Sequence, residues 1–379
     1  MLFAAGSRQV GKTTLARMSG NHYLDWDNFD HRAIILKGPA AVANYCGLEV
    51  ASDQPVRIVF DELHKYSRWK TFLKGLFDTY ETACRIVVTG SARMDVYRRG
   101  GDSLMGRYFS CRIHPFSVAE IIRPHRSSDA IVHKPTPISQ RDWDDLMRFG
   151  GFPEPFMRRD DRFSRRWQKT RKERLFKEDI RDLTRVQELG QIEALAQILA
   201  DRSGQQIVFA NLAQEVQVAP NTVKGWVQTL VATYYGFLVR PWFRNVSRAL
   251  RKEPKWFLRD WSEIADFGAR AETITACHLL KAVEYWNDCG LGEFDLRYIR
   301  DKQKREVDFL VVRDGEPWFL VESKQSDLGL SPALAHFQKE TGARHAFQVV
   351  ITHPYHDKDC FSFSSPVVVS ARTLFSQLV

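Results

Sequence analysis

The segment Gly6-Ser7-Arg8-Gln9-Val10-Gly11-Lys12-Thr13 follows a short apolar stretch, Leu2 to Ala5, at the start of a chain of 379 residues. It matches the pattern G-x-x-x-x-G-K-[ST] in full, and a helical run begins directly after it at Thr14. The glycines allow backbone N–H groups to approach phosphate oxygens, and the start of the helix adds a favourable dipole. The segment therefore predicts a phosphate-binding loop between a strand and a helix.

This loop predicts a nucleotide site with a bound metal ion. Lys12 is expected to contact the β- and γ-phosphates of ATP, and the hydroxyl of Thr13 is expected to bind Mg²⁺. The alternative is a chance match in the wrong context, which the acidic motif described next disfavours. The expected nucleotide-binding residues are Gly6, Ser7, Arg8, Gln9, Val10, Gly11, Lys12, Thr13 and Thr14.

Two carboxylates, Asp61 and Glu62, end a second apolar stretch that begins at Val56. Asp61 is expected to hold Mg²⁺, generally through water, and Glu62 to polarise the attacking water as a general base. The alternative is an acidic pair that caps the following helix. A third apolar stretch, Arg85 to Thr89, leads to Ser91, which we expect to orient that water or to sense the γ-phosphate.

Composition narrows the class of protein. Hydrophobic residues make up 44% of the chain, which is ample for packed cores, and no run of eighteen apolar residues predicts a membrane span. No basic stretch followed by an apolar one precedes the loop, so no secretory signal is indicated. The six cysteines are scattered without a C-x-x-C pair, which indicates reduced thiols and a cytoplasmic protein without a membrane partner.

Basic residues give the chain a net charge of +9 and crowd the stretch from Arg158 to Arg185. Acidic residues are interleaved there at helical spacing. The favoured interpretation is a solvated helix with ion pairs between residues i and i+4. The alternative is a basic contact surface for nucleic acid.

Two short helices separated by a turn are predicted between residues 211 and 230, with Asn211 and Asn221 as their N-caps. They resemble a helix-turn-helix, so DNA is an expected partner. Lys224 and Trp226 on the second helix are candidates for contact with DNA. The alternative is a buried helical pair that links two domains, and the helical spacing of Trp226 favours a place in the core for this side chain.

Further motifs extend the analysis of the first third of the chain: Asp61-Glu62-Leu63-His64-Lys65-Tyr66, Val88-Thr89-Gly90-Ser91-Ala92-Arg93, Gly106-Arg107-Tyr108 and His114-Pro115-Phe116-Ser117. With them, the chain resembles a family of prokaryotic AAA-type ATPases whose members usually carry a C-terminal domain of unknown function. The resemblance covers nearly the whole chain and implies ATP binding and hydrolysis. Similar proteins usually have a leader before the phosphate-loop strand, whereas here Met1 begins that strand, so we expect either a short strand or a sequence that starts internally.

The resemblance also suggests an arginine that completes the site of a neighbouring subunit in a homo-oligomer. Arg107 is the first candidate, and Arg98 and Arg99 are the others. An ion pair within the same chain is an equal alternative for Arg107.

Near the C-terminus, Asp308 precedes Glu322-Ser323-Lys324 by fourteen residues, within two alternating strands. This pattern resembles the D…E-x-K core of the PD-(D/E)XK nucleases, in which two carboxylates bind Mg²⁺ and a lysine activates water. Asp308 joins the face of Glu322 only if the two residues pair, which predicts an odd loop, most simply of three residues around Gly315. Glu272, on a preceding helix, is the expected additional glutamate. The alternative is an ordinary hairpin with solvated charges.

Together these patterns predict an α/β chain in four parts: a P-loop, parallel-sheet ATPase core at 1–125, a helical lid or linker at 126–200, a winged-helix-like segment at 201–256 and a mixed α/β nuclease-like domain at 257–379. Two hypotheses follow for its function. One is an ATPase that acts on nucleic acid, with Mg²⁺-dependent nuclease activity as an extension. The other is an ATP-controlled binding module whose nuclease-like domain recognises protein or DNA without cutting it.

Overall fold

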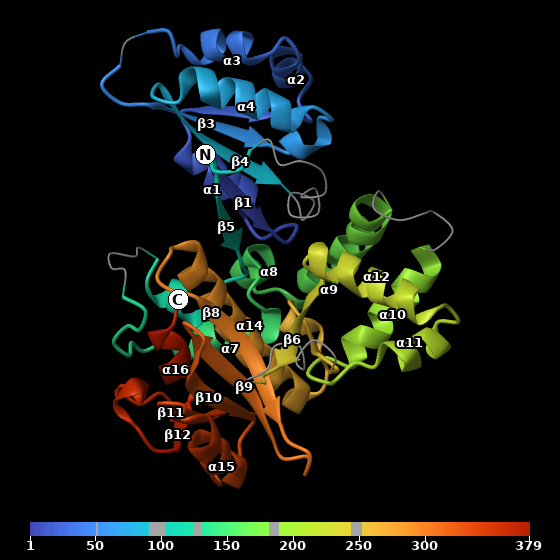
Figure 1. Cartoon of the computed structure of the whole chain (residues 1–379), viewed down its shortest axis with the longest axis vertical. Coiled ribbons are helices and arrows are strands. Elements are labelled where there is room, and N and C mark those ends of the chain that lie inside the picture. The colour runs from blue at the N-terminus through green and yellow to red at the C-terminus, as the bar shows by residue number, and fades with distance from the viewer. Residues whose placement is uncertain (51, 91–103, 125–129, 182–188, 244–251) are drawn as a thin grey trace. The chain divides into compact units, whose positions relative to one another are not determined.

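The structure is a computed structural model that describes residues 1–50, 52–90, 104–124, 130–181, 189–243 and 252–379 (Figure 1). The chain forms two compact units. The first consists of Met1–His114 with Ala232–Tyr234, and the second of Pro115–Val231 with Tyr235–Val379. The expected boundary at 125 thus lies shortly after the main stretch of the first unit.

The first unit is built on a five-stranded sheet in the order β2-β3-β4-β1-β5, in which all neighbours are parallel. The three predicted apolar strands are β1, β3 and β4, and the predicted parallel sheet is therefore present. Because all carboxyl ends of the strands lie at one edge, the segments that follow them can meet there. The strands are β1 (Leu2–Gly6), β2 (His22–Asp25), β3 (Val56–Asp61), β4 (Cys84–Gly90) and β5 (Phe109–Ile113).

Helices pack against this sheet and close its core. Helix α1 contacts β1, β3 and β4, whereas α3 packs against α4. The apolar face of α4 contributes Phe72, Leu73 and Leu76 to the core, which also contains Phe60 and Val88. The helices are α1 (Lys12–Ser19), α2 (Phe29–Leu36), α3 (Pro39–Cys46), the 3-10 turn η1 (Leu63–Lys65) and α4 (Trp69–Tyr80).

The second unit contains a seven-stranded mixed sheet in the order β12-β11-β10-β9-β8-β6-β7. Its strands are β6 (Gly236–Pro241), β7 (Lys255–Leu258), β8 (Phe294–Arg300), β9 (Glu306–Arg313), β10 (Glu316–Lys324), β11 (His345–Val350) and β12 (Val367–Ser370). Alternate residues of β9 enter two different cores. Phe309 and Val311 pack in the core that includes α14 (Phe267–Asp288), and Leu310 and Val312 in the core that includes α15 (Pro332–Thr341).

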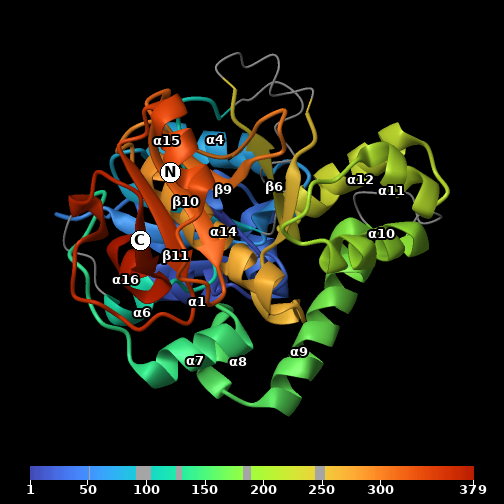
Figure 2. The ribbon, with the colours of Figure 1, turned by 90° about the horizontal axis from the view of Figure 1, so that it is seen from below.

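Residues 140–231 of the second unit are mainly helical where described, as predicted for most of this stretch. Figure 2 shows α10, α11 and α12 grouped beside β6. The helices of the unit not yet given are α6 (Val118–Ile122), α7 (Gln140–Phe149), α8 (Pro153–Arg158), α9 (Asp161–Arg174), the π-helical η2 (Leu175–Ile180), α10 (Leu189–Asp201), α11 (Phe209–Glu215), α12 (Pro220–Ala232), the 3-10 turns η4 (Trp261–Glu263) and η5 (Cys360–Ser362), and α16 (Ala371–Gln377).

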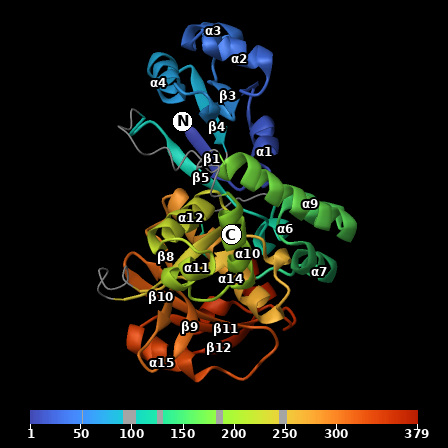
Figure 3. The same ribbon diagram turned by 90° about the vertical axis from the view of Figure 1, so that its right-hand side faces the viewer.

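The strands that follow the helix-turn-helix pattern join the C-terminal sheet. β6 pairs with β7 in antiparallel fashion and with β8 in parallel, so these two strands, which begin within the expected winged-helix-like segment, extend that sheet. Figure 3 shows β8 to β12 with α15 beside them. The expected boundary between residues 256 and 257 falls inside β7.

The β9–β10 hairpin has the predicted register but not the predicted loop. Asp314 and Gly315, with φ of 51° and 83°, form a turn of two residues. A bulge at Trp318 then shifts the pairing by one residue, so that Val321 lies opposite Phe309. Continuing that register brings Glu322 opposite Asp308. The three-residue loop was wrong because a bulge supplies the odd residue within the strand.

Candidate functional site

The phosphate loop connects β1 to α1 in a tight path. A Cβ on Gly6 would lie 2.3 Å from the carbonyl oxygen of Ile113, so only glycine fits beside β5. Gln9 and Gly11 have φ of 62° and 97°, in the left-handed region. These two positions turn the chain sharply before the first turn of the helix.

The Lys12 side chain folds back over this loop. Its Nζ donates hydrogen bonds to the carbonyl oxygens of Gly6 and Ser7, at 2.8 and 2.6 Å, and the residue is only 8% exposed. The loop thus already positions a cation beside backbone that turns at a helix N-terminus. Such a combination fits a phosphate group, because an ammonium and the N–H groups of a first helical turn both favour anions.

Asp61, at the end of β3, receives three side-chain hydrogen bonds. The hydroxyls of Thr13 and Tyr23 donate to Oδ2 at 2.9 and 2.5 Å, and the hydroxyl of Thr89 donates to Oδ1. Burial alone would raise the pKa of Asp61, but the hydrogen bonds and the charge of Lys12 outweigh it and lower the pKa. Asp61 is therefore held as a carboxylate beside Thr13, the pair expected to hold Mg²⁺.

Glu62 follows the end of β3 and precedes the 3-10 turn η1. Its φ of 54° is left-handed, and its Oε2 lies 3.3 Å from Nζ of Lys65 and 3.7 Å from Nε2 of His64. Burial raises the pKa of Glu62, with a smaller contribution from Asp61, while the Lys65 ammonium opposes the rise. The two carboxylates thus differ: the pKa of Asp61 is lowered, which keeps it ionised, whereas the pKa of Glu62 is raised, which makes it the stronger base.

Two residues of this site were not predicted, Tyr23 and Thr89. Each lies near the end of a strand that neighbours β3, since Asp25 and Thr89 both pair with Asp61 in the sheet register. Thr89 could have been found as a polar side chain at the carboxyl end of a predicted strand, where neighbouring strands of a parallel sheet converge. Tyr23 gave no such signal, because its strand β2 was not predicted. Ser91, Arg98 and Arg99 lie outside the described residues, so their predicted roles stay predictions.

Arg107 forms an ion pair within the first unit. Its Nε and Nη2 donate to the two carboxylate oxygens of Asp78, at 2.7 and 3.1 Å. The amino group of Met1 donates to the Arg107 carbonyl oxygen at 3.0 Å, which places Arg107 at the start of β1. The phosphate loop lies at the other end of that strand, so Arg107 could act only on the site of another copy, and that role stays a prediction.

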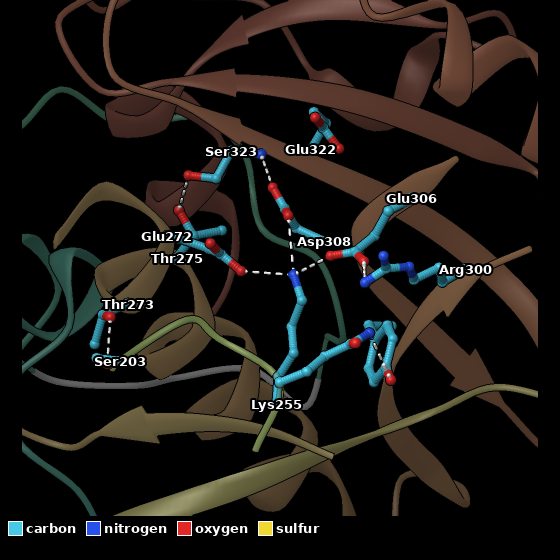
Figure 4. A network of polar contacts seen from close by, with 12 residues as sticks. Ser203, Lys255, Glu272, Thr273, Thr275, Arg300, Glu306, Asp308, Glu322 and Ser323 are labelled. Carbon is cyan, nitrogen blue, oxygen red and sulfur yellow. Dashed lines mark hydrogen bonds and ion pairs between the residues drawn. The ribbon is translucent and has the colours of Figure 1, made fainter. Parts of the chain in front are cut away.

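A cluster of carboxylates surrounds a buried lysine in the second unit (Figure 4). Nζ of Lys255 lies 2.8 Å from Glu272, 2.6 Å from Glu306 and 3.2 Å from Asp308. Oδ2 of Asp308 also accepts a hydrogen bond from the backbone N–H of Ser323, at 2.9 Å. Two of the predicted nuclease residues, Glu272 and Asp308, are therefore brought together, but through a lysine that the sequence did not indicate.

The other two predicted nuclease residues, Glu322 and Lys324, form a pair of their own. Nζ of Lys324 donates to Oε1 of Glu322 at 2.8 Å. Burial, and to a smaller extent the charge of Asp308, raises the pKa of Glu322. The second oxygen, Oε2, is buried and has no hydrogen-bond partner within the described ranges. In that same part of the chain, no group of three His, Cys, Asp or Glu side chains could hold a metal ion.

The helix-turn-helix candidate consists of α11 and α12, but both helices begin earlier than predicted. α11 starts at Phe209 after Val208, and α12 starts at Pro220, so Asn211 and Asn221 lie inside the helices and are not their caps. Trp226 is 4% exposed and packs in a core with Val223 and Leu230, as its spacing indicated. The solvent-facing side chains of α12 include Asn221, Lys224 and Gln228.

The basic stretch on α9 is only partly a solvated helix. Arg162, Arg165, Arg166 and Lys169 are exposed. Arg171 instead is buried and pairs with Asp260 at 2.8 Å, and Lys172 pairs with Glu263 at 2.5 Å. These partners belong to the segment at η4 rather than to the same helix, so packing and not local spacing decides them.

The first unit thus has the fold and the residues of a P-loop domain with an acidic strand end. Comparison with known families agrees: residues 1–122 match a family model described as an AAA domain, which supports an AAA-type P-loop ATPase. Residues 140–265 match a family model described as Domain of unknown function (DUF8612).

Similar proteins include one from Mycobacterium bovis and one from Mycobacterium tuberculosis, both described as uncharacterized. Each is 23% identical to this chain over 329 residues, a stretch that covers 84% of this chain and 69% of the relative. The similarity therefore extends beyond the AAA domain into the second unit. No helix in the described part of the chain is both long and apolar enough to cross a membrane.

Proposed function

We propose that the first unit binds ATP with Mg²⁺ and hydrolyses it. The observation that carries this proposal is the contact between Thr13 and Asp61 beside the folded-back Lys12. A hydroxyl and a carboxylate 2.9 Å apart provide the oxygen ligands that Mg²⁺ prefers, and the lysine lies on the phosphate loop itself. The bound Mg²⁺ would neutralise charge on the phosphate oxygens.

Within this proposal the residues have separate roles. Lys12 exchanges its two carbonyl partners for phosphate oxygens and holds the nucleotide in place. Thr13 and Asp61 hold the metal ion, with Tyr23 and Thr89 fixing the orientation of the carboxylate. Glu62 accepts a proton from the attacking water, which its raised pKa favours. Ser91 is the expected additional contact to that water.

The test compares two variants of the full chain. Lys12→Ala is expected to lose binding of a fluorescent ATP analogue, whereas Glu62→Gln is expected to bind ATP normally and to lower kcat by about 10²- to 10⁴-fold. The measurements are equilibrium binding and phosphate release. Normal turnover by Glu62→Gln would show that another group is the base.

For the second unit we propose contact with nucleic acid through α12, as part of an ATP-controlled binding module. The helix packs its apolar side into a core and presents Asn221, Lys224 and Gln228 to solvent. Amide side chains and lysines are groups that bond to bases and phosphates. Exposed arginines of α9, such as Arg162 and Arg166, would add phosphate contacts.

Salt dependence and substitution test this second proposal. Lys224→Ala is expected to weaken binding to a DNA duplex and to lower the slope of log K against log[salt] by about 1. A matched control is Lys339→Ala at the end of α15, which is expected to change neither quantity. Affinity that barely changes between low and moderate salt would contradict a surface that contacts phosphates.

Mg²⁺-dependent cleavage by Glu272, Asp308, Glu322 and Lys324 is the finer version of the nucleic-acid hypothesis, and recognition without cleavage is its alternative. Cleavage of linear or branched DNA that is lost in Lys324→Ala but kept in Lys12→Ala would support a nuclease. Absence of cleavage of DNA and RNA with several metals would support the binding module.

A further inference from the structure

We infer that Lys255 is the resident cation of the carboxylate cluster in the second unit, and that its ammonium takes the place a divalent metal would need there. The inference is independent of the proposed ATPase. It concerns a lysine at the start of β7, whose side chain is 4% exposed and ends among Glu272, Glu306 and Asp308 (Figure 4).

The number and the lengths of the contacts fit an ammonium. A lysine has three N–H donors, and three different carboxylates lie 2.6 to 3.2 Å from this Nζ. These are hydrogen-bond distances, whereas Mg²⁺ requires oxygen ligands at about 2.0–2.1 Å in octahedral arrangement. The carboxylates therefore converge on Lys255 rather than on a vacant ligand set.

The expected metal ligands have other partners. Asp308 contacts Lys255 through Oδ1 and accepts the Ser323 N–H through Oδ2. Glu322 accepts from Lys324 through Oε1, which leaves its buried Oε2 as the single oxygen of these two carboxylates without a partner in the described structure. One such oxygen is too few to hold Mg²⁺.

The balance of charge points the same way. When all four are ionised, the carboxylates Glu272, Glu306, Asp308 and Glu322 are paired with three basic groups, Lys255, Lys324 and Arg300, of which Arg300 lies 3.3 Å from Glu306. A divalent ion beside these groups would make the cluster cationic. Without Lys255 the same cluster would have two uncompensated negative charges, which a single divalent ion matches.

The cluster also has a structural consequence that a solvated hairpin would not have. Lys255 ties β7 to α14 through Glu272 and to β9 through Glu306 and Asp308. Glu272 is confined on its other side, because a Cβ on Gly204 would lie 2.9 Å from its Oε2. Lys255 thus links the edge strand β7 to α14 and β9, and the cluster binds no metal ion while the ammonium is in place.

Binding of Mn²⁺ to the full chain without nucleotide, followed by electron paramagnetic resonance, tests the inference. With Lys255 in place, Asp308→Asn is expected to leave the Mn²⁺ isotherm unchanged, because the cluster binds no metal. Lys255→Met is expected to create a site with a dissociation constant at least about tenfold lower than any in the parent, since two negative charges of the cluster then lack a cation. Adding Asp308→Asn to Lys255→Met is expected to remove that site.

Lys252→Met, three residues earlier and exposed, is the matched control and is expected to create no site. If Lys255→Met unfolds without metal, Mn²⁺ is expected to raise its Tm, and to do so much less when Asp308 is also replaced. A parent Mn²⁺ site that Asp308→Asn removes would overturn the inference, whatever the stability of the lysine variant. So would a folded Lys255→Met protein that gains no metal site.

Discussion

Glu62 and Lys65 form a pair whose electrostatics predict how turnover depends on pH. Glu62 must be ionised to accept a proton, and burial raises its pKa above the ordinary value of 4.5, against the opposing charge of Lys65 at 3.3 Å. Replacing Lys65 by Met removes that opposing charge and raises the pKa further. The acid limb of kcat is therefore expected to move to higher pH in Lys65→Met, as measured by ATP turnover across the acid range.

Lys74→Met is the matched control, because this lysine is exposed on α4 and is not among the groups that shift the pKa of Glu62. It is expected to keep the parent pH profile. An acid limb in Lys65→Met that stays in place, or moves to lower pH, would show that Glu62 does not titrate in turnover.

The lowered pKa of Asp61 predicts that the free energy of unfolding of the first unit depends on pH. Its folded pKa lies below the ordinary value of 3.8, so its stabilising effect is fully present above that value and is lost as pH falls through the lowered pKa. Asp61→Asn is expected to be less stable than the parent at pH 7 in urea unfolding. The difference should shrink as pH is lowered below about 4.

A stability difference that persisted unchanged to the lowest pH would contradict an ionised Asp61 in the fold.

Among individual residues, the sequence indicated Lys12, Thr13 and Asp61 because their motifs are contiguous. Tyr23, Thr89 and Lys255 were missed because their partners meet them only through strand register or tertiary packing, which no local spacing encodes.

Replacing two glycines by alanine is expected to change the free energy of unfolding in opposite directions, because one lies in a turn and the other in a helix. Gly315, in the β9–β10 turn, has φ of 83° and a Cβ there would meet nothing within 4 Å, so Gly315→Ala costs only backbone strain. We expect it to lower the free energy of unfolding by about 1 kcal/mol. Gly225, inside α12 with equally open surroundings, should gain about 0.5–1 kcal/mol on replacement by Ala. Urea unfolding of both variants measures the two changes.

Changes in stability of the same sign at Gly315 and Gly225 would contradict this assignment of turn and helix.

The β9–β10 hairpin shows what the alternation of apolar and polar residues can and cannot predict. The pairing of Asp308 with Glu322 followed from the need to place both on one face. The bulge at Trp318 could not be predicted, because a three-residue loop and a two-residue turn with a bulge give the same register.

Across the whole molecule, the parallel sheet of the first unit was predicted and is present, since short apolar runs separated by helical patterns specify it. The second unit was harder. Its β6 pairs in parallel with β8, although α14 lies between them in the sequence. That pairing places β6 and β7 in the C-terminal sheet. Composition and periodicity carry no information about pairing over such a distance.

Coupling between ATP and nucleic acid is the prediction that concerns the whole chain. If the nucleotide state controls the second unit, a non-hydrolysable ATP analogue with Mg²⁺ must change DNA affinity, typically by about 5- to 150-fold. Saturating DNA must then change the affinity for the analogue by the same factor. Fluorescence anisotropy of labelled DNA and of labelled analogue measures both sides.

Two variants make this test specific. Lys12→Ala should abolish the nucleotide effect on DNA binding, because it removes a phosphate contact. Glu62→Gln should keep it, because it leaves binding intact and blocks only the proton transfer. Equal DNA affinity with and without the analogue, in a chain shown to bind both, would mean that the ATPase and the nucleic-acid surface work independently; unequal factors on the two sides would mean that a second nucleotide or DNA site exists.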